Sequence, residues 1–110
     1  MSQKFENLLK PGRIGNITIR NRIVMPPMEI NRCTPDGLIT KRYIDYYTAR
    51  AKGGTGLIIA GAFFVHPAGK LGAHQPGIHS DACIQRLSDL ASACKEWGCK
   101  AAIQIVHAGR

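Results

Sequence analysis

Apolar segments alternate with amphipathic segments along this chain. The apolar residues 22–25 precede a segment with helical spacing, which leads to the apolar run from residue 57 to about 62. A second helical segment leads to a further apolar run over residues 101–105, read as a strand buried on both faces. The order strand, helix, strand, helix, strand predicts two consecutive βαβ units, which require a parallel α/β sheet with right-handed connections. An open doubly wound sheet and a (β/α)8 barrel both satisfy this order.

Capping and turn residues mark the ends of the first helical segment. Thr40 is placed as its N-cap, and Ile44, Tyr47 and Ala51 lie three and four residues apart on one face. Gly53-Gly54 supplies the end of the helix. The glycines at 53, 54 and 56 follow a helix and precede a strand, which is the reverse of the order in a dinucleotide-binding loop.

The second helical segment begins after a long loop rich in Gly and Pro. Ser80 or Asp81 is expected to cap it, and Gly98 to terminate it. Its apolar stripe is predicted to contain Ile84, Leu87, Ala91, Cys94 and Trp97. Earlier in the chain, Gly15-Asn16 predicts a tight hairpin turn, and Pro26-Pro27 must end the first strand because proline offers no backbone donor.

Composition excludes several classes of protein. The 110 residues are 45% hydrophobic and 20% charged, as in an ordinary globular domain. The formal charge of +8 is scattered without a basic stripe, so we expect no nucleic-acid partner. The longest apolar run, residues 56–65, is far shorter than the ~20 residues of a membrane helix, and the start of the chain lacks a secretory signal, so a soluble cytoplasmic protein without a membrane partner is expected.

The four cysteines carry no metal-binding signature. They lack a CxxC pair or another metal-ligand spacing, and the context is intracellular. We therefore expect reduced thiols and no metal site.

Polar residues follow the predicted strands at the edge where parallel α/β folds place their chemistry. The first strand runs into the prolines, Met28 and Glu29, the second into Ala62, and the third carries Gln104. Gln104 needs a polar partner if it is buried, because an unpaired buried amide costs roughly 1–3 kcal/mol. This edge suits a flat heterocycle with alternating donors and acceptors. A purely structural role for the same residues is the other interpretation.

Three motifs in register resemble one family. NRIVMPPM at 21–28, RAKGGTGLIIAGA at 50–62 and IQIVHAGR at 103–110 resemble the amino-terminal third of the Old Yellow Enzyme family, the NADH:flavin oxidoreductases and ene-reductases. The resemblance covers about residues 5–110. It implies that residues 1–110 form an N-terminal portion of an FMN-binding (β/α)8 TIM barrel, with about three β/α units and an N-terminal hairpin, and that the rest of the barrel is absent.

The resemblance also implies a cofactor site. The loop after the first strand would lay its backbone against the flavin ring, a small residue would contact that ring, and a glutamine would bind its pyrimidine edge. The matching positions here are Pro26, Pro27, Met28, Glu29, Ala62 and Gln104. No catalytic residue can be assigned. His107 and Arg110 belong to the family signature without an assigned role, and Asn31 matches a substrate-side position only loosely.

The implied activity is reduction of activated C=C bonds in a small-molecule enone or enoate, with NAD(P)H as reductant of FMN. The chain alone is expected to be inactive and to self-associate, because an open sheet exposes its edges and one face. Glu29 stands where many relatives carry Cys or Thr. Our hypothesis is that its ionised form makes the flavin harder to reduce.

Three alternatives remain open. The chain could belong to a larger iron-sulfur flavoenzyme of the enoate or dienoyl-CoA reductase type, with FAD in a second domain. It could be a non-catalytic basic binding module. It could also be an unrelated doubly wound protein, for which a cluster of acidic residues at the strand ends is expected.

Overall fold

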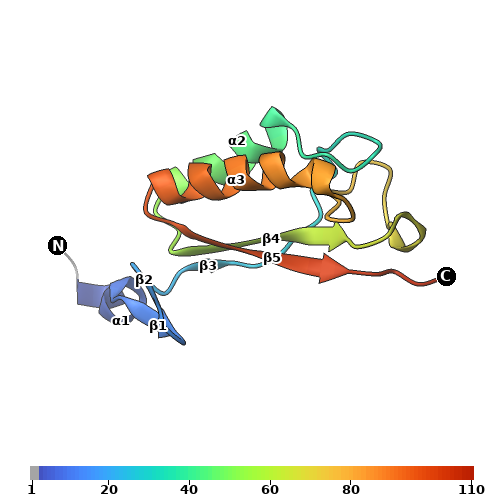
Figure 1. Cartoon of the computed structure of the whole chain (residues 1–110). Coiled ribbons are helices and arrows are strands. Elements are labelled where there is room, and N and C mark those ends of the chain that lie inside the picture. The colour runs from blue at the N-terminus through green and yellow to red at the C-terminus, as the bar shows by residue number, and fades with distance from the viewer. Residues whose placement is uncertain (1–2) are drawn as a thin grey trace.

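Two layers make up most of the molecule, a parallel sheet and a pair of helices that cover one of its faces (Figure 1). The computed structural model describes residues 3–110. Its strands are β1 (Gly12–Ile14), β2 (Ile17–Ile19), β3 (Val24–Met25), β4 (Leu57–Phe64) and β5 (Lys100–Val106). Its helices are α1 (Glu6–Leu9), α2 (Lys41–Lys52) and α3 (Ile84–Glu96), with short 3-10 turns at Gln3–Phe5, Pro67–Gly69 and Asp81–Cys83.

The main sheet has the order β3-β4-β5, and both of its pairings are parallel. The predicted βαβ units are therefore confirmed: α2 connects β3 to β4, and α3 connects β4 to β5. β3 is shorter than the predicted residues 22–25, and β4 continues two residues beyond the predicted end at Ala62. The antiparallel β1–β2 ribbon confirms the predicted hairpin, with Gly15 at φ 56° in its turn.

Helix α2 begins and ends where the sequence predicts. The Thr40 hydroxyl accepts a hydrogen bond from Tyr43 N at 3.2 Å, which satisfies one free amide of the first turn. Gly54, at φ 112°, follows the last turn in a conformation that glycine adopts without strain. The helix buries Tyr43, Tyr47 and Ala51, whereas Ile44 is only half-buried.

The predicted stripe of α3 is wrong at both ends. Ile84 is 62% exposed and Trp97 is 39% exposed, while Leu90 and Cys94 are buried. Leu90 and Cys94 are four residues apart and define the line that meets the sheet, so the ends of the predicted stripe turn away from it. Gly98, at φ 74°, ends the helix as predicted. Ser80 precedes the 3-10 turn but makes no side-chain capping bond.

Aromatic side chains fill the layer between α2 and the sheet. The rings of Tyr43 and Tyr47 lie 5.0 Å apart, and Tyr43 contacts Phe63 of β4 edge-on at 6.2 Å. Ile58 and Ala60 point into the same core. Because side chains alternate along a strand, the neighbouring Leu57 and Ile59 lie on the other face of β4.

The prediction that residues 101–105 are buried on both faces is wrong for this chain. Within the described residues 3–110, β5 is an edge strand that pairs only with β4, and Ile105 is 62% exposed. Among residues 3–110, helices cover only one face of the sheet (Figure 1). Such a free edge and open face agree with the expected self-association, which stays a prediction.

Arg20 joins the hairpin to the ends of both long helices. Its guanidinium donates to Ala51 O at 2.7 Å, to Thr55 O at 2.9 Å and to Trp97 O. These carbonyls lie at or just beyond the C-termini of α2 and α3, where a positive charge is favourable. Arg20 therefore holds the amino-terminal ends of the two connected strands in place.

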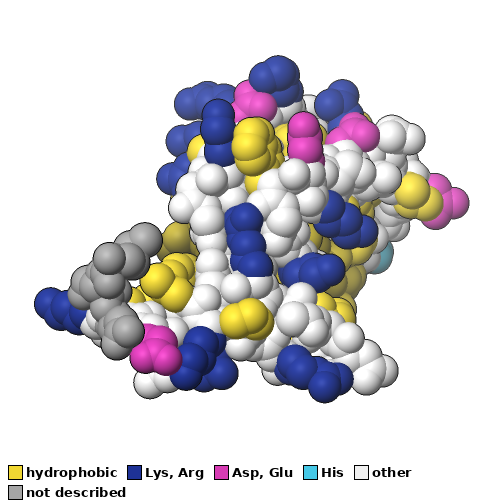
Figure 2. Space-filling view, turned by 90° about the vertical axis from the view of Figure 1, so that its left-hand side faces the viewer, with side chains coloured by type: hydrophobic (Ala, Val, Ile, Leu, Met, Phe, Trp, Pro, Cys, Tyr) yellow, Lys and Arg dark blue, Asp and Glu magenta, His cyan; other side chains and the backbone are white. Residues whose placement is uncertain are grey.

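Basic side chains are spread over the surface from one end of the visible face to the other (Figure 2). This distribution agrees with the scattered pattern in the sequence. No helix within residues 3–110 has the length and apolar character that crossing a membrane requires.

Candidate functional site

The segments expected to hold a cofactor meet at one edge of the sheet. β4 and β5 run parallel and end side by side (Figure 1). β3 ends earlier, with Met25 beside Ile58, and the chain after it reaches the end of β4 at Glu29, whose carboxyl group meets the amide of Ala62. Residues 26–29 continue from β3, Ala62 lies near the end of β4, and Gln104 lies near the end of β5. The structure thus brings together the three parts of the predicted site.

A bulge in β4 lies opposite Gln104. Ala60 pairs with Ile103 and Phe63 pairs with Ile105, so Gly61 and Ala62 together oppose the single residue Gln104. Such a bulge re-aims side chains and is common beside functional sites. It brings the backbone around Ala62 next to the glutamine.

Gln104 lies on the face of the sheet opposite to the helices. Ala102 has the same orientation and pairs with Ile59, whereas α2 and α3 cover the face of Ile58 and Ala60. Gln104 is exposed, which differs from the predicted buried amide, and its side chain makes no hydrogen bond to residues 3–110. Its donor and its acceptor are both available to a ligand.

Glu29 lies against the end of β4. The backbone amides of Asn31 and Ala62 hydrogen-bond to its carboxyl group and lower its pKa, but partial burial is the larger effect and raises the pKa above the ordinary 4.5. This contact connects two residues of the predicted site, Glu29 and Ala62. It also places a titratable group where the sequence resemblance predicts a flavin.

Gln75 fixes the carbonyl group of Ala62 and was missed by the sequence analysis. Its amide is fully buried, with Nε2 donating to Ala62 O at 3.0 Å and Oε1 accepting from Leu71 N at 2.6 Å. Both ends of the amide are therefore used. An isolated glutamine in a loop of glycines and prolines was the only sequence signal for this role.

Two tyrosine hydroxyls are buried beneath the same edge. The hydroxyls of Tyr43 and Tyr47 have no hydrogen-bond partner at normal distance within residues 3–110. Burial, with a smaller contribution from the charge of Glu29, raises the pKa of both phenols. Burial and the same carboxylate also raise the pKa of Cys33 to about 12. These groups are thus neutral beneath the Glu29 carboxyl.

His107 packs against the turn that follows β4. Its Nδ1 accepts a hydrogen bond from Gly109 N at 3.0 Å, and Ala108 N donates to Gly69 O at 3.0 Å. A β-carbon on Gly69 would lie 2.6 Å from the His107 ring, so the ring covers that glycine. These contacts give His107 a structural role in this chain, whereas Arg110 is exposed and makes no hydrogen bond or ion pair within residues 3–110.

Comparison with known proteins identifies the family. The sequence pattern of the NADH:flavin oxidoreductase / NADH oxidase family matches residues 7–110. This chain belongs to that family. The family consists of oxidoreductases, as the sequence analysis predicted.

Relatives and solved structures agree with this assignment. NADH oxidase of Thermoanaerobacter brockii is 50% identical over 107 residues, which are 96% of this chain and 16% of that protein. NADPH dehydrogenase of Geobacillus sp. (strain WCH70) is 43% identical over 94% of this chain and 31% of that protein. The old yellow enzyme structure from Trypanosoma cruzi superposes with a TM-score of 0.88 at 38% identity, covering 96% of this chain and 28% of that one. The chain therefore spans less than a third of the length of each.

Proposed function

We propose that this chain supplies the first β/α units of an FMN-binding (β/α)8 barrel in an NAD(P)H-dependent oxidoreductase. The parallel order β3-β4-β5, with helices on one face only, is the arrangement that the first strands of such a barrel require. The open face would then line the barrel interior. Membership of the flavin oxidoreductase family supports FMN and NAD(P)H as cofactors.

The strand-end residues fit a flavin. The backbone of residues 26–29 offers a rigid wall because Pro26 and Pro27 fix its conformation, and the small side chain of Ala62 leaves room beside it. The observation that carries the proposal is the unpaired amide of Gln104 beside the bulge at Gly61 and Ala62. An amide matches the alternating donors and acceptors at the pyrimidine edge of a flavin.

Bound FMN would supply hydride transfer between NAD(P)H and a substrate, which we propose is an activated alkene such as an enone or enoate. The residues of this chain would position the flavin ring and influence its reduction. Gln75 holds the Ala62 carbonyl, and Gln104 orients the ring by hydrogen bonds. Glu29 places a carboxyl group at this edge, and its raised pKa favours the neutral form at mildly acidic pH.

Flavin binding by a glutamine variant tests the proposal. We expect Gln104→Ala to weaken FMN binding roughly threefold to tenfold, the loss of one or two neutral hydrogen bonds. Gln85→Ala is the matched control, because Gln85 is exposed on α3 and its side chain hydrogen-bonds only Asp89 among residues 3–110. Quenching of flavin fluorescence gives both dissociation constants. Equal affinity of the Gln104 variant and the wild type would overturn the assignment.

A longer iron-sulfur flavoenzyme is the second candidate. The length of one relative favours it. This chain covers 16% of the NADH oxidase of Thermoanaerobacter brockii, compared with 31% of the NADPH dehydrogenase. The more similar relative is therefore about twice as long. Iron and FAD analysis of the protein from its own source separates the two candidates, since only the longer architecture contains either group.

A further inference from the structure

A pocket of about 350 Å³ lies on the loops beside the proposed flavin edge. It is lined by Asn31, Arg32, Cys33, Thr40, Arg42 and His74. These residues come from the loop after β3, the start of α2 and the loop after β4. They therefore belong to the carboxyl edge of the sheet, but none of them is among the residues assigned to FMN.

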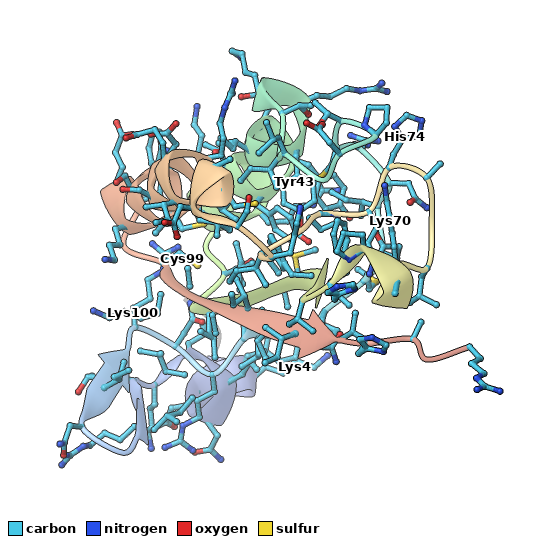
Figure 3. The ribbon with its side chains drawn as sticks, turned by 45° about the vertical axis from the view of Figure 1, so that its right-hand side comes forward. Lys4, Tyr43, Lys70, His74, Cys99 and Lys100 are labelled. Atoms are coloured by element: carbon cyan, nitrogen blue, oxygen red, sulfur yellow. The ribbon has the colours of Figure 1, made fainter. Side chains whose placement is uncertain are left out.

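Hydrogen bonds hold the walls of this pocket in place. Cys33 N donates to His74 O at 3.1 Å, and His74 Nδ1 donates to Cys33 O at 2.9 Å, so two segments 41 residues apart are tied together. The Thr40 hydroxyl donates to Arg32 O and accepts from Tyr43 N, which fixes the start of α2 against the loop. Figure 3 shows His74 beyond the end of the sheet, on the side of the helices. The pocket is thus preorganised.

The two arginine side chains of this pocket form no ion pair within residues 3–110. The exposed side chain of Arg42 has no ion pair or hydrogen bond among residues 3–110. The Arg32 guanidinium lies 5.2 Å from the centre of the Tyr46 ring and also makes no ion pair or hydrogen bond with the described residues. The lining contains no acidic side chain. On the flanking segments, Asp45 pairs with Lys41 at 2.6 Å, and Asp36 accepts from the Thr34 hydroxyl. Two guanidinium groups therefore lie on one concave surface whose lining holds no acidic side chain, and the charge of Glu29, which acts on Cys33, comes from outside that lining.

We propose that this pocket binds a phosphate group of an organic ligand. Guanidinium groups bind phosphate oxygens with paired, charge-assisted hydrogen bonds, and the first turn of α2 adds the positive end of a twelve-residue helix. The phosphate site rests on the pocket alone. The identity of the ligand rests on the proposed function. If the neighbouring edge holds a reacting flavin, the phosphate group belongs to a substrate or reductant, such as a coenzyme A thioester or NADPH.

Calorimetric titration with inorganic pyrophosphate at low ionic strength tests the site directly. Wild-type protein should bind pyrophosphate, and Arg42→Met should bind it at least tenfold more weakly. Arg86→Met is the matched control. Arg86 is exposed on α3, so its replacement removes the same charge from a place outside the pocket. Arg32→Met provides a second, independent variant with the same expected loss, and far-UV circular dichroism checks that each variant is folded.

Two outcomes would overturn the phosphate site. The first is that wild-type protein does not bind pyrophosphate. The second is that Arg42→Met and Arg86→Met lose the same amount of pyrophosphate affinity, which would indicate attraction by net charge only. FMN titration of Arg42→Met runs in parallel. Arg42 is not assigned to the flavin, so unchanged FMN affinity together with lost pyrophosphate binding supports two separate sites. If no variant binds FMN, only the proposed function is contradicted.

Matched ligand pairs identify the source of the phosphate. NADPH and NADH differ by one phosphate group, and so do coenzyme A and its 3'-dephospho form. Tighter binding of NADPH in wild type, lost in Arg42→Met, assigns the pocket to the reductant, and the same result with coenzyme A assigns it to an acyl carrier. No difference within either pair would contradict an organic phosphate ligand.

Discussion

Gly61 and Gln104 face each other across β4 and β5 with no room for another atom between them. A β-carbon built on Gly61 would lie 2.9 Å from Cβ of Gln104 and 3.1 Å from its carbonyl oxygen. One of these atoms is a backbone oxygen and the other is the first side-chain carbon, so neither can rotate away. A glycine at this position therefore allows β5 to place Gln104 at the edge where we propose the flavin binds.

Replacing that glycine should disturb both the sheet and the site. We expect Gly61→Ala to lower the free energy of unfolding by about 1–3 kcal/mol, as for other overpacked positions, and to weaken FMN binding. Gly53→Ala is the control, because Gly53 has ordinary helical backbone at the end of α2. Urea denaturation at a fixed protein concentration measures the first effect. A Gly61 variant as stable as the control would contradict the close packing.

Arg20 offers a test of how the hairpin is attached. Its guanidinium donates to three backbone carbonyls, so Arg20→Met should destabilise the chain by about 1.5–3 kcal/mol, the range for hydrogen bonds to charged groups. Arg13→Met is the matched control, since Arg13 makes one exposed contact of 3.4 Å within the hairpin turn. Urea denaturation followed by Trp97 fluorescence compares the two. Equal stability of both variants would exclude the proposed attachment.

The raised pKa of Glu29 makes stability depend on pH. Between the ordinary pKa of 4.5 and the raised native value, the folded chain keeps a proton that the unfolded chain releases. The free energy of unfolding should therefore fall as pH rises through this window and stay reduced above it. Glu29→Gln should remove this loss, so its stability relative to wild type should increase from pH 4 to pH 7. Glu96→Gln, exposed on α3, should show no such trend.

The cysteines should be unreactive while the chain is folded. All four are free and buried, and burial raises the pKa of Cys33 to about 12 and that of Cys94 to about 11. Since the thiolate is the reactive form, we expect slow alkylation by iodoacetamide at pH 8 and rapid modification of all four thiols in urea. Mass spectrometry counts the modified sites. Rapid modification of Cys33 in the native protein would contradict its burial.

The sequence predicted the order of elements because each one is encoded locally. Thr40, Gly54 and Gly98 mark helix ends by their own backbone preferences, and hydrophobic spacing indicates the helices between them. Burial was predicted less well. The exposure of β5 depends on which strands and layers lie beside it, and a strand's own residues do not contain that information.

The residues of the candidate site were also predicted in part, and for the same reason. Pro26, Ala62 and Gln104 were found because they follow or end apolar strands. Gln75 was missed because its role depends on a loop that folds back onto the end of β4. The contact between Glu29 and the Ala62 amide also joins segments more than 30 residues apart, so only the folded chain reveals it.

The central claim is that FMN binds where residues 26–29 meet the carboxyl ends of β4 and β5. Native mass spectrometry of the protein purified from its own source tests it most directly, because one spectrum gives the mass of the chain and that of any bound cofactor. We expect one FMN per chain, released on denaturation. A folded chain of 12.0 kDa without flavin would contradict the claim.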